Sequence, residues 1–215
     1  MTKPDRAGHS QRVLVIACGA IAHEIVAIRK ANRWEHVVVQ CLPAEWHNRP
    51  ERIAPGVEEK ISAQLGNFER IFVAYADCGT GGMLDDVLNR YDVERLPGSH
   101  CYEFFTGTSA FNELVEEEIG TFYLTDFLAR HFERVILRGL GLDRHPELMP
   151  MYFGNYKRLV YLAQRSDDAL AEAAERAAST LGLEYEYRFT GLEPFCSCLV
   201  DFNHTDARTG AEGRT

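Results

Sequence analysis

The apolar run Val13-Leu-Val-Ile-Ala17, followed directly by Cys18-Gly19, is the stretch that decides the fold class. Five consecutive apolar residues without polar alternation are typical of a strand that is buried on both faces of a sheet. The residues from Ala20 to Asn32 then predict a helix. Further strand patterns occur at residues 37–41, 70–75, 159–162 and 184–189. Helical stretches lie between them, and this rhythm predicts an α/β fold: a Rossmann-like, mostly parallel sheet with helices on both faces.

Two parts of the chain have weaker patterns. Residues 104–132 predict helix with a break at Gly120, and the apolar segment Cys198 to Phe202 predicts one more strand, at an edge of the sheet. Elsewhere the helix signals are clearer. Residues 50–66 begin with a proline, residues 83–91 follow a glycine-rich turn, and residues 167–183 have an aspartate at the start and a glycine near the end.

The length of 215 residues is typical of one domain, and no internal repeat is visible. We expect a single α/β domain over residues 12–202. The polar segments 1–11 and 203–215 predict flexible tails.

The chain is acidic, with 23 Lys and Arg against 32 Asp and Glu, a formal net charge of −9. Nucleic acids and anionic membranes need a basic surface, so neither is an expected partner. No apolar run approaches the ~20 residues of a transmembrane helix, and the N-terminus lacks the apolar centre of a signal peptide. The sequence therefore predicts a cytoplasmic protein with a small-molecule substrate. A homodimer is an expectation drawn from the acidic charge and the domain size.

Reactive side chains follow four successive strand patterns. Cys18 follows the first strand, His47 lies in the loop after the second, Cys78 follows the third, and Cys101 comes after the short apolar piece at 93–96. Because parallel strands bind ligands at their carboxyl ends, these residues predict a site at one edge of the sheet.

Three interpretations of the cysteines stay open. Thiolates and imidazoles are ligands of zinc and of iron–sulfur clusters, and Cys18, Cys78, Cys101 and His47 form a candidate metal set. The same cysteines could instead be metal-free thiols of a site, or small hydrophobic residues in the packing. We expect Cys41 in the core. The pair Cys196 and Cys198 has no assigned role.

The glycine-rich segment 75–82 is a strand-to-helix turn that contains Asp77 and Cys78. Its backbone N–H groups could bind a cofactor, as could that of Gly19, although a tight turn is the simpler explanation. The candidate cofactor-binding residues are Gly19, Gly79, Thr80 and Gly81. For proton transfer, the candidate catalytic residues are His47, Asp77 and His100.

Several short motifs occur in a characteristic order: Ala17-Cys18-Gly19, the segment 42–50, Tyr75-x-x-Cys78-Gly79, Pro97-x-x-His100-Cys101 and the segment 120–125. In this order they resemble the bacterial and archaeal family known as domain of unknown function 1638, over about residues 12–190. The family's cysteine and histidine positions correspond to Cys18, His47, Cys78 and Cys101. Many members have an Asp directly before the last cysteine, where this chain has His100.

Members of that family are often encoded near corrinoid-dependent methyltransferases and corrinoid-binding proteins. The resemblance therefore implies a partner of that kind and a role in one-carbon metabolism. Two hypotheses follow. The first is a metal–thiolate protein with zinc or an iron–sulfur cluster, either an enzyme or an accessory factor. The second is a non-catalytic module that binds a small molecule, such as a corrinoid or a pterin, with metal-free cysteines.

Overall fold

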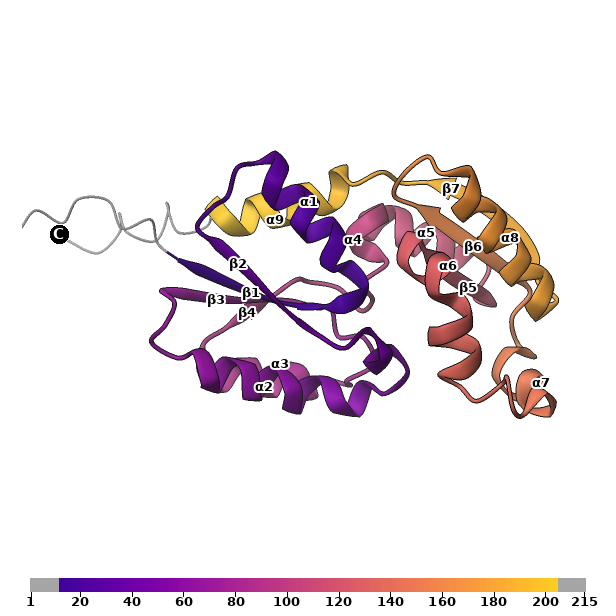
Figure 1. Ribbon diagram of the computed structural model, residues 1–215, viewed down its shortest axis with the longest axis horizontal. Coiled ribbons are helices and arrows are strands. Elements are labelled where there is room, and N and C mark those ends of the chain that lie inside the picture. Colours follow the sequence, from indigo (N-terminus) through magenta and orange to yellow (C-terminus); the bar gives the residue numbers. More distant parts are fainter. Residues whose placement is uncertain (1–11, 205–215) are drawn as a thin grey trace, which may run out of the picture. The chain divides into compact units, whose positions relative to one another are not determined.

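The computed structural model describes residues 12–204 and divides the chain into two compact units (Figure 1). The first unit ends at His100 and the second begins at Cys101. From the sequence we expected one domain over residues 12–202. Of the predicted tails, 1–11 and 205–215 lie outside the described residues, whereas residues 203 and 204 belong to the last helix.

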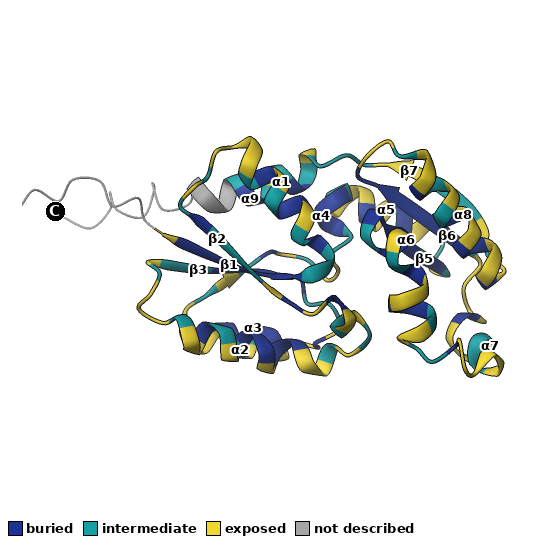
Figure 2. Cartoon of the chain, in the orientation of Figure 1, coloured by how far each residue is buried: buried dark blue, intermediate teal, exposed yellow. Residues whose placement is uncertain are grey.

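The first unit is built on a four-stranded parallel sheet with the strand order β2-β1-β3-β4. The strands are β1 (Val13–Cys18), β2 (Val37–Leu42), β3 (Arg70–Ala74) and β4 (Glu94–Arg95). Every residue of β1 is buried, as Figure 2 shows, which explains its unbroken apolar sequence.

Helices cover both faces of this sheet. The helix α1 (Ala22–Ala31) lies on one face, and α2 (Ile53–Gln64) and α3 (Met83–Tyr91) pack together on the other (Figure 1). Short 3-10 turns connect the strands to these helices: η1 (Gly19–Ile21), η2 (Ala44–Asn48) and η3 (Pro50–Arg52).

The second unit has a three-stranded parallel sheet with the order β5-β6-β7. Its strands are β5 (Thr121–Thr125), β6 (Arg158–Ala163) and β7 (Glu184–Phe189). One face packs against α6 (Asp126–Phe132) and α8 (Asp168–Leu181), and α5 (Thr108–Glu117) packs on the other. The remaining elements are α4 (Glu103–Thr106), η4 (Glu133–Arg138), η5 (Pro146–Leu148), α7 (Met149–Phe153) and α9 (Glu193–His204).

The α/β class is confirmed, with parallel sheets and helices on both faces of each. Two local predictions are wrong. Residues 121–125 form a strand inside the stretch expected to be helical, and residues 198–202 lie in a helix rather than an edge strand. In α9 the buried Phe195 and Leu199 are four residues apart and share one helical face, which explains why this segment is a helix.

No helix among residues 12–204 has the length and apolarity that crossing a membrane requires. The cytoplasmic location predicted from the sequence stays a prediction.

Candidate functional site

The chain order reverses between β1 and β3 in the first sheet. From β1 the chain moves to β2 on one side, and it then crosses back to place β3 on the other side of β1. In open parallel sheets this switch point, outside the carboxyl ends of the strands, is where ligands bind. The two loops that flank it carry Cys18-Gly19 and the segment 75–82.

Cys18 is the last residue of β1, and its thiol is buried. Its Sγ accepts a hydrogen bond from the N–H of Ala20 at 3.4 Å. Burial raises the pKa of Cys18 to about 11. That value includes a smaller rise from the nearby Cys78 and the opposing effects of the Ala20 N–H and the Tyr75 side chain. Cys18 is therefore a neutral thiol at pH 7, with Cys78 and Tyr75 as its neighbours.

Cys78 lies in the loop after β3 and is half-buried. Its φ of 49° places it in the left-handed region that few non-glycine residues adopt. The N–H of Cys78 donates to the carbonyl of Ser99 at 2.9 Å, and the N–H of Asp77 donates to that of Gly98 at 3.1 Å. These bonds hold the loop after β3 against the segment that follows β4.

Asp77 closes this loop with its own carboxylate. Its Oδ1 accepts from Thr80 Oγ1 at 2.7 Å and from the N–H of Gly82 at 3.0 Å, and its Oδ2 accepts from the N–H of Gly81 at 3.2 Å. Partial burial raises the pKa of Asp77, but the hydrogen bonds outweigh it and keep the pKa below its ordinary value. The carboxylate therefore closes the loop that leads into α3, and its predicted catalytic role stays a prediction.

The predicted cofactor-binding residues have structural roles in this loop and the neighbouring one. Gly19 allows a close backbone approach, because a Cβ there would meet the carbonyl oxygen of Leu42 at 3.0 Å. Gly79 and Gly81 have positive φ, and Thr80 is buried, with its hydroxyl bound to Asp77. Because Asp77 binds the N–H of Gly81, that group is not free for a phosphate.

The two histidines of the first unit come from different loops and lie within electrostatic reach of each other. His47 is in η2 and reaches the surface, and His100 follows β4. The surrounding protein and the neighbouring His100 both disfavour the charged form of His47 and lower its pKa. His47 is thus a neutral imidazole at pH 7, able to accept or donate a hydrogen bond.

The remaining cysteines differ from the predictions or lie elsewhere. Cys41 is exposed on the edge strand β2, so its predicted place in the core is wrong. Cys101 is in the second unit, in the turn before α4. Cys196 and Cys198 are two residues apart on α9, and side chains at that spacing point to different faces of a helix. They do not form a chelating pair.

Within the described chain, no three His, Cys, Asp or Glu side chains gather closely enough to hold a metal ion. The predicted grouping of Cys18, Cys78, Cys101 and His47 stays a prediction. What the first unit does bring together is a thiol pair with Tyr75 at the switch point. Sequence reasoning missed Tyr75, although its place three residues before Cys78 was a usable signal.

The comparisons with known proteins agree with this picture of an unassigned site. No curated protein and no solved structure matches the chain. A family model described as "Protein of unknown function (DUF1638)" matches residues 41–199, which is most of the chain and includes Cys78, Cys101 and both histidines. The chain therefore belongs to this family of proteins of unknown function.

Proposed function

We propose that the first unit binds a small molecule at the switch point between β1 and β3, with the thiols of Cys18 and Cys78 in the wall of the site. The observation that carries this proposal is the position of the two cysteines. Cys18 ends β1 and Cys78 follows β3, the two strands between which the chain order reverses, and the two thiols interact electrostatically. The rule for ligand sites in parallel sheets supports the same location.

The electrostatics of this edge favour an uncharged ligand group over a phosphate. The loop that starts α3 already holds a carboxylate on its N–H groups, and a second anion there would be repelled by Asp77. Cys18 and His47 are neutral at pH 7. The side chains at this edge therefore provide two thiols, an imidazole and a phenol. These groups form weak polar contacts with neutral or aromatic ligands.

A protonated, buried Cys18 is a poor nucleophile, because the thiolate is the reactive form. The site is accordingly proposed as a binding site, not as a covalent catalyst. The predicted small-molecule substrate would be a bound ligand in this scheme. A corrinoid or pterin ligand, and a corrinoid protein or methyltransferase as partner, stay predictions.

The second candidate is a metal–thiolate centre with zinc or an iron–sulfur cluster. It is favoured by the convergence of soft ligands, since Cys18, Cys78, His47 and His100 all follow strands of one parallel sheet. The described residues supply only the thiol pair at close range and no group of three ligands, so the geometry fits a metal less well than a metal-free site.

Metal analysis and an absorption spectrum of the full chain, purified without oxygen, separate the two candidates. For the metal-free site we expect a colourless protein with far less than one metal ion per chain. About one zinc or one cluster per chain, lost in both Cys18→Ser and Cys78→Ser but kept in the control Cys41→Ser, would overturn the first proposal in favour of the second.

Ligand binding is then tested by a thermal-shift screen of nucleosides, pterins and corrinoids, followed by differential alkylation. A compound that binds at the switch point should slow the reaction of Cys78 with N-ethylmaleimide and leave the exposed Cys41 unaffected. Compounds that raise the melting temperature without protecting Cys78 would place binding elsewhere and refute the proposed site.

A further inference from the structure

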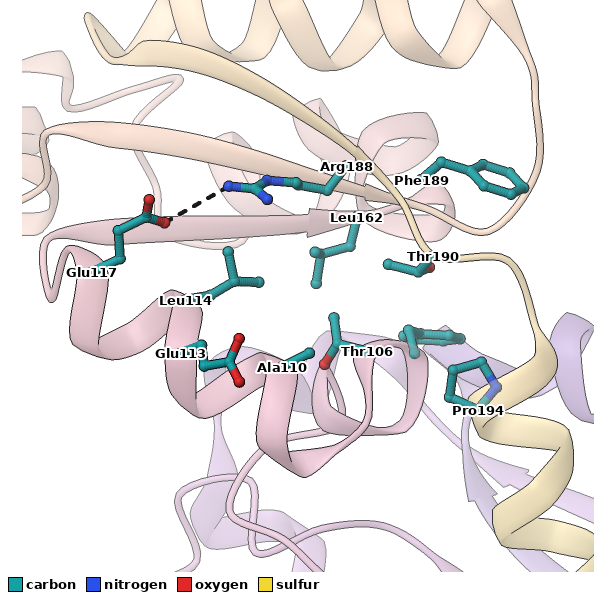
Figure 3. A pocket seen from close by; sticks show the side chains of 11 residues that line it. Thr106, Ala110, Glu113, Leu114, Glu117, Leu162, Arg188, Phe189, Thr190 and Pro194 are labelled. Atoms are coloured by element: carbon teal, nitrogen blue, oxygen red, sulfur yellow. Dashed lines mark ion pairs between the residues drawn. The ribbon is translucent and has the colours of Figure 1, made fainter.

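The second unit contains a cavity of about 550 Å³, near the carboxyl ends of β6 and β7 (Figure 3). This volume is within the range of small-molecule sites in proteins. The cavity lies between α5 and the strands, with the end of α4 and the start of α9 as its remaining walls. None of its lining residues belongs to the candidate site of the first unit.

The packing of one helix against three strands accounts for the cavity. An α-helix is about 10 Å wide and strands are about 4.8 Å apart, so one helix covers about two strands. Phe111 and Leu114 of α5 pack on β5 and β6. In β7, the residues that share this face are Glu186 and Arg188, which are paired in register with Val160 and Leu162. The face of β7 on the α5 side is consequently polar and not covered by the helix.

The cavity has an apolar floor and two hydroxyl groups on its walls. Leu114 and Leu162 form the floor, and Phe189 is at the rim, with its exposed ring pointing away from Leu162 (Figure 3). The hydroxyl of Thr106 donates to the carbonyl of Gly107 at 3.1 Å, and that of Thr190 donates to the carbonyl of Ala163 at 3.1 Å. Their hydrogens are thus used, and their oxygens are left as acceptors for a ligand.

Charges at the cavity leave one carboxylate without a cation. Glu117 pairs with Arg158 at 3.1 Å and with Arg188 at 3.7 Å, and both arginines also pair with Glu186. By contrast, Glu113 accepts a hydrogen bond from Ser109 at 3.4 Å and has no ion pair with any residue from 12 to 200, the range whose side chains the structure describes. Figure 3 shows its side chain on α5, on the same side of the cavity as Thr106 and across from Arg188 and Thr190.

We propose that this cavity binds a small organic cation: a primary ammonium or an amidinium group carried on an apolar body. Glu113 would neutralise the cation, and the oxygens of Thr106 and Thr190 would accept its N–H groups. The apolar body would lie on Leu114 and Leu162. Such a ligand matches all three features of the cavity. Its charge matches the carboxylate, its N–H groups match the acceptor oxygens, and its apolar body matches the leucine floor.

The proposal is tested by titrating the full chain with phenethylamine and with benzamidine. Calorimetry measures the binding, and backbone NMR locates it. We expect saturable binding, with amide shift changes at Ala110 and Thr190. The neutral analogue 2-phenylethanol and the anion phenylacetate should bind at least about tenfold more weakly, because they lack the charge-assisted contact to Glu113.

The decisive variant is Glu113→Gln, which keeps the shape of an exposed side chain and removes its charge. Its matched control is Glu116→Gln, which removes a charge from the same helix outside the cavity. Glu113→Gln should weaken amine binding about tenfold or more, and Glu116→Gln should leave it unchanged. Equal losses in both variants, equal binding of 2-phenylethanol, or no shift changes at the cavity would overturn the proposal.

Discussion

An aspartate follows a parallel strand in each unit, Asp77 after β3 in the first and Asp126 after β5 in the second. Asp77 accepts hydrogen bonds from Thr80, Gly81 and Gly82, all within five residues of it. Asp126 accepts instead from Tyr161 at 2.8 Å, from the N–H of Gln164 at 3.0 Å and from Arg165 at 3.2 Å. One carboxylate organises its own loop, whereas the other joins two strands that are distant in sequence.

This difference separates a loop that is held by local hydrogen bonds from a sheet end whose hydrogen bonds join distant parts of the chain. The donors of Asp126 are 35 to 39 residues away, so its bonds form only when β5 and β6 are paired. Asp77 needs only its own turn, and its loop leaves the thiols of Cys18 and Cys78 at the switch point. The carboxylate at the end of the second sheet is satisfied internally, and the carboxylate without an ion pair at the cavity of that unit, among the described side chains, is Glu113.

The largest expected effect is the loss of the Asp126 contacts. Asp126 is almost fully buried, at 1% exposure, and Asp126→Asn would turn an amide group toward some of its donors. We expect the free energy of unfolding of the second unit to fall by about 3 kcal/mol. Urea denaturation, with hydrogen exchange to assign the loss to β5 and β6, measures it. The control Glu172→Gln, in an exposed ion pair, should change stability by less than about 0.5 kcal/mol.

The next effect concerns Cys18 at alkaline pH. Its pKa is about 11 in the folded protein and 9.0 without burial, so the unfolded chain loses this proton first. The stability from the neutral thiol is complete below pH 9 and is lost as the pH rises toward 11, by roughly 2 kcal/mol. Urea denaturation at pH 8 and pH 10.5 should show this slope reduced in Cys18→Ala. A slope that is equally reduced in Cys41→Ala would contradict the assignment.

A smaller effect is expected for Asp77→Asn. The amide keeps one acceptor and loses the charge and part of the hydrogen bonding that closes the loop 77–82, at a cost of about 1 kcal/mol at pH 7. Because the pKa of Asp77 is lowered in the folded protein, its contribution is present above the ordinary pKa near 4 and is lost as the pH falls below it. The melting temperatures of variant and wild type should therefore differ at pH 7 and converge toward pH 3. Asp86→Asn, on the same helix but outside the loop, is the control.

The sequence pattern was sufficient for much of the first unit. The apolar run before Cys18 predicted a buried strand, and the residues 83–91 predicted α3 with the bounds that the structure has. Proximity of Cys18 and Cys78 followed from the rule that parallel strands end at one edge. The exposure of Cys41 could not be predicted in this way, because an edge strand and a central strand have the same apolar pattern when only one sequence is available.

The second unit was harder for physical reasons. The strand Thr121–Thr125 is rich in β-branched and aromatic residues, but it is short and lies between two helices, so the helical pattern around it dominated. The cavity has no sequence signal at all. Its residues come from α4, α5, β6, β7, the loop after β7 and α9, and only the three-dimensional packing shows that one helix leaves β7 uncovered.

The left-handed backbone of Cys78 sets local stability against the presence of a thiol at the proposed site. A glycine adopts a φ of 49° without the steric conflict of a Cβ, so Cys78→Gly should make the folded protein more stable, by up to about 1 kcal/mol in melting experiments. A chain selected for stability alone would favour glycine at this position, as it has at Gly79, Gly81 and Gly82 next to it. Cys78 thus occupies a backbone position at which glycine would be less strained, and such local strain is common at binding sites, which supports the ligand site proposed above.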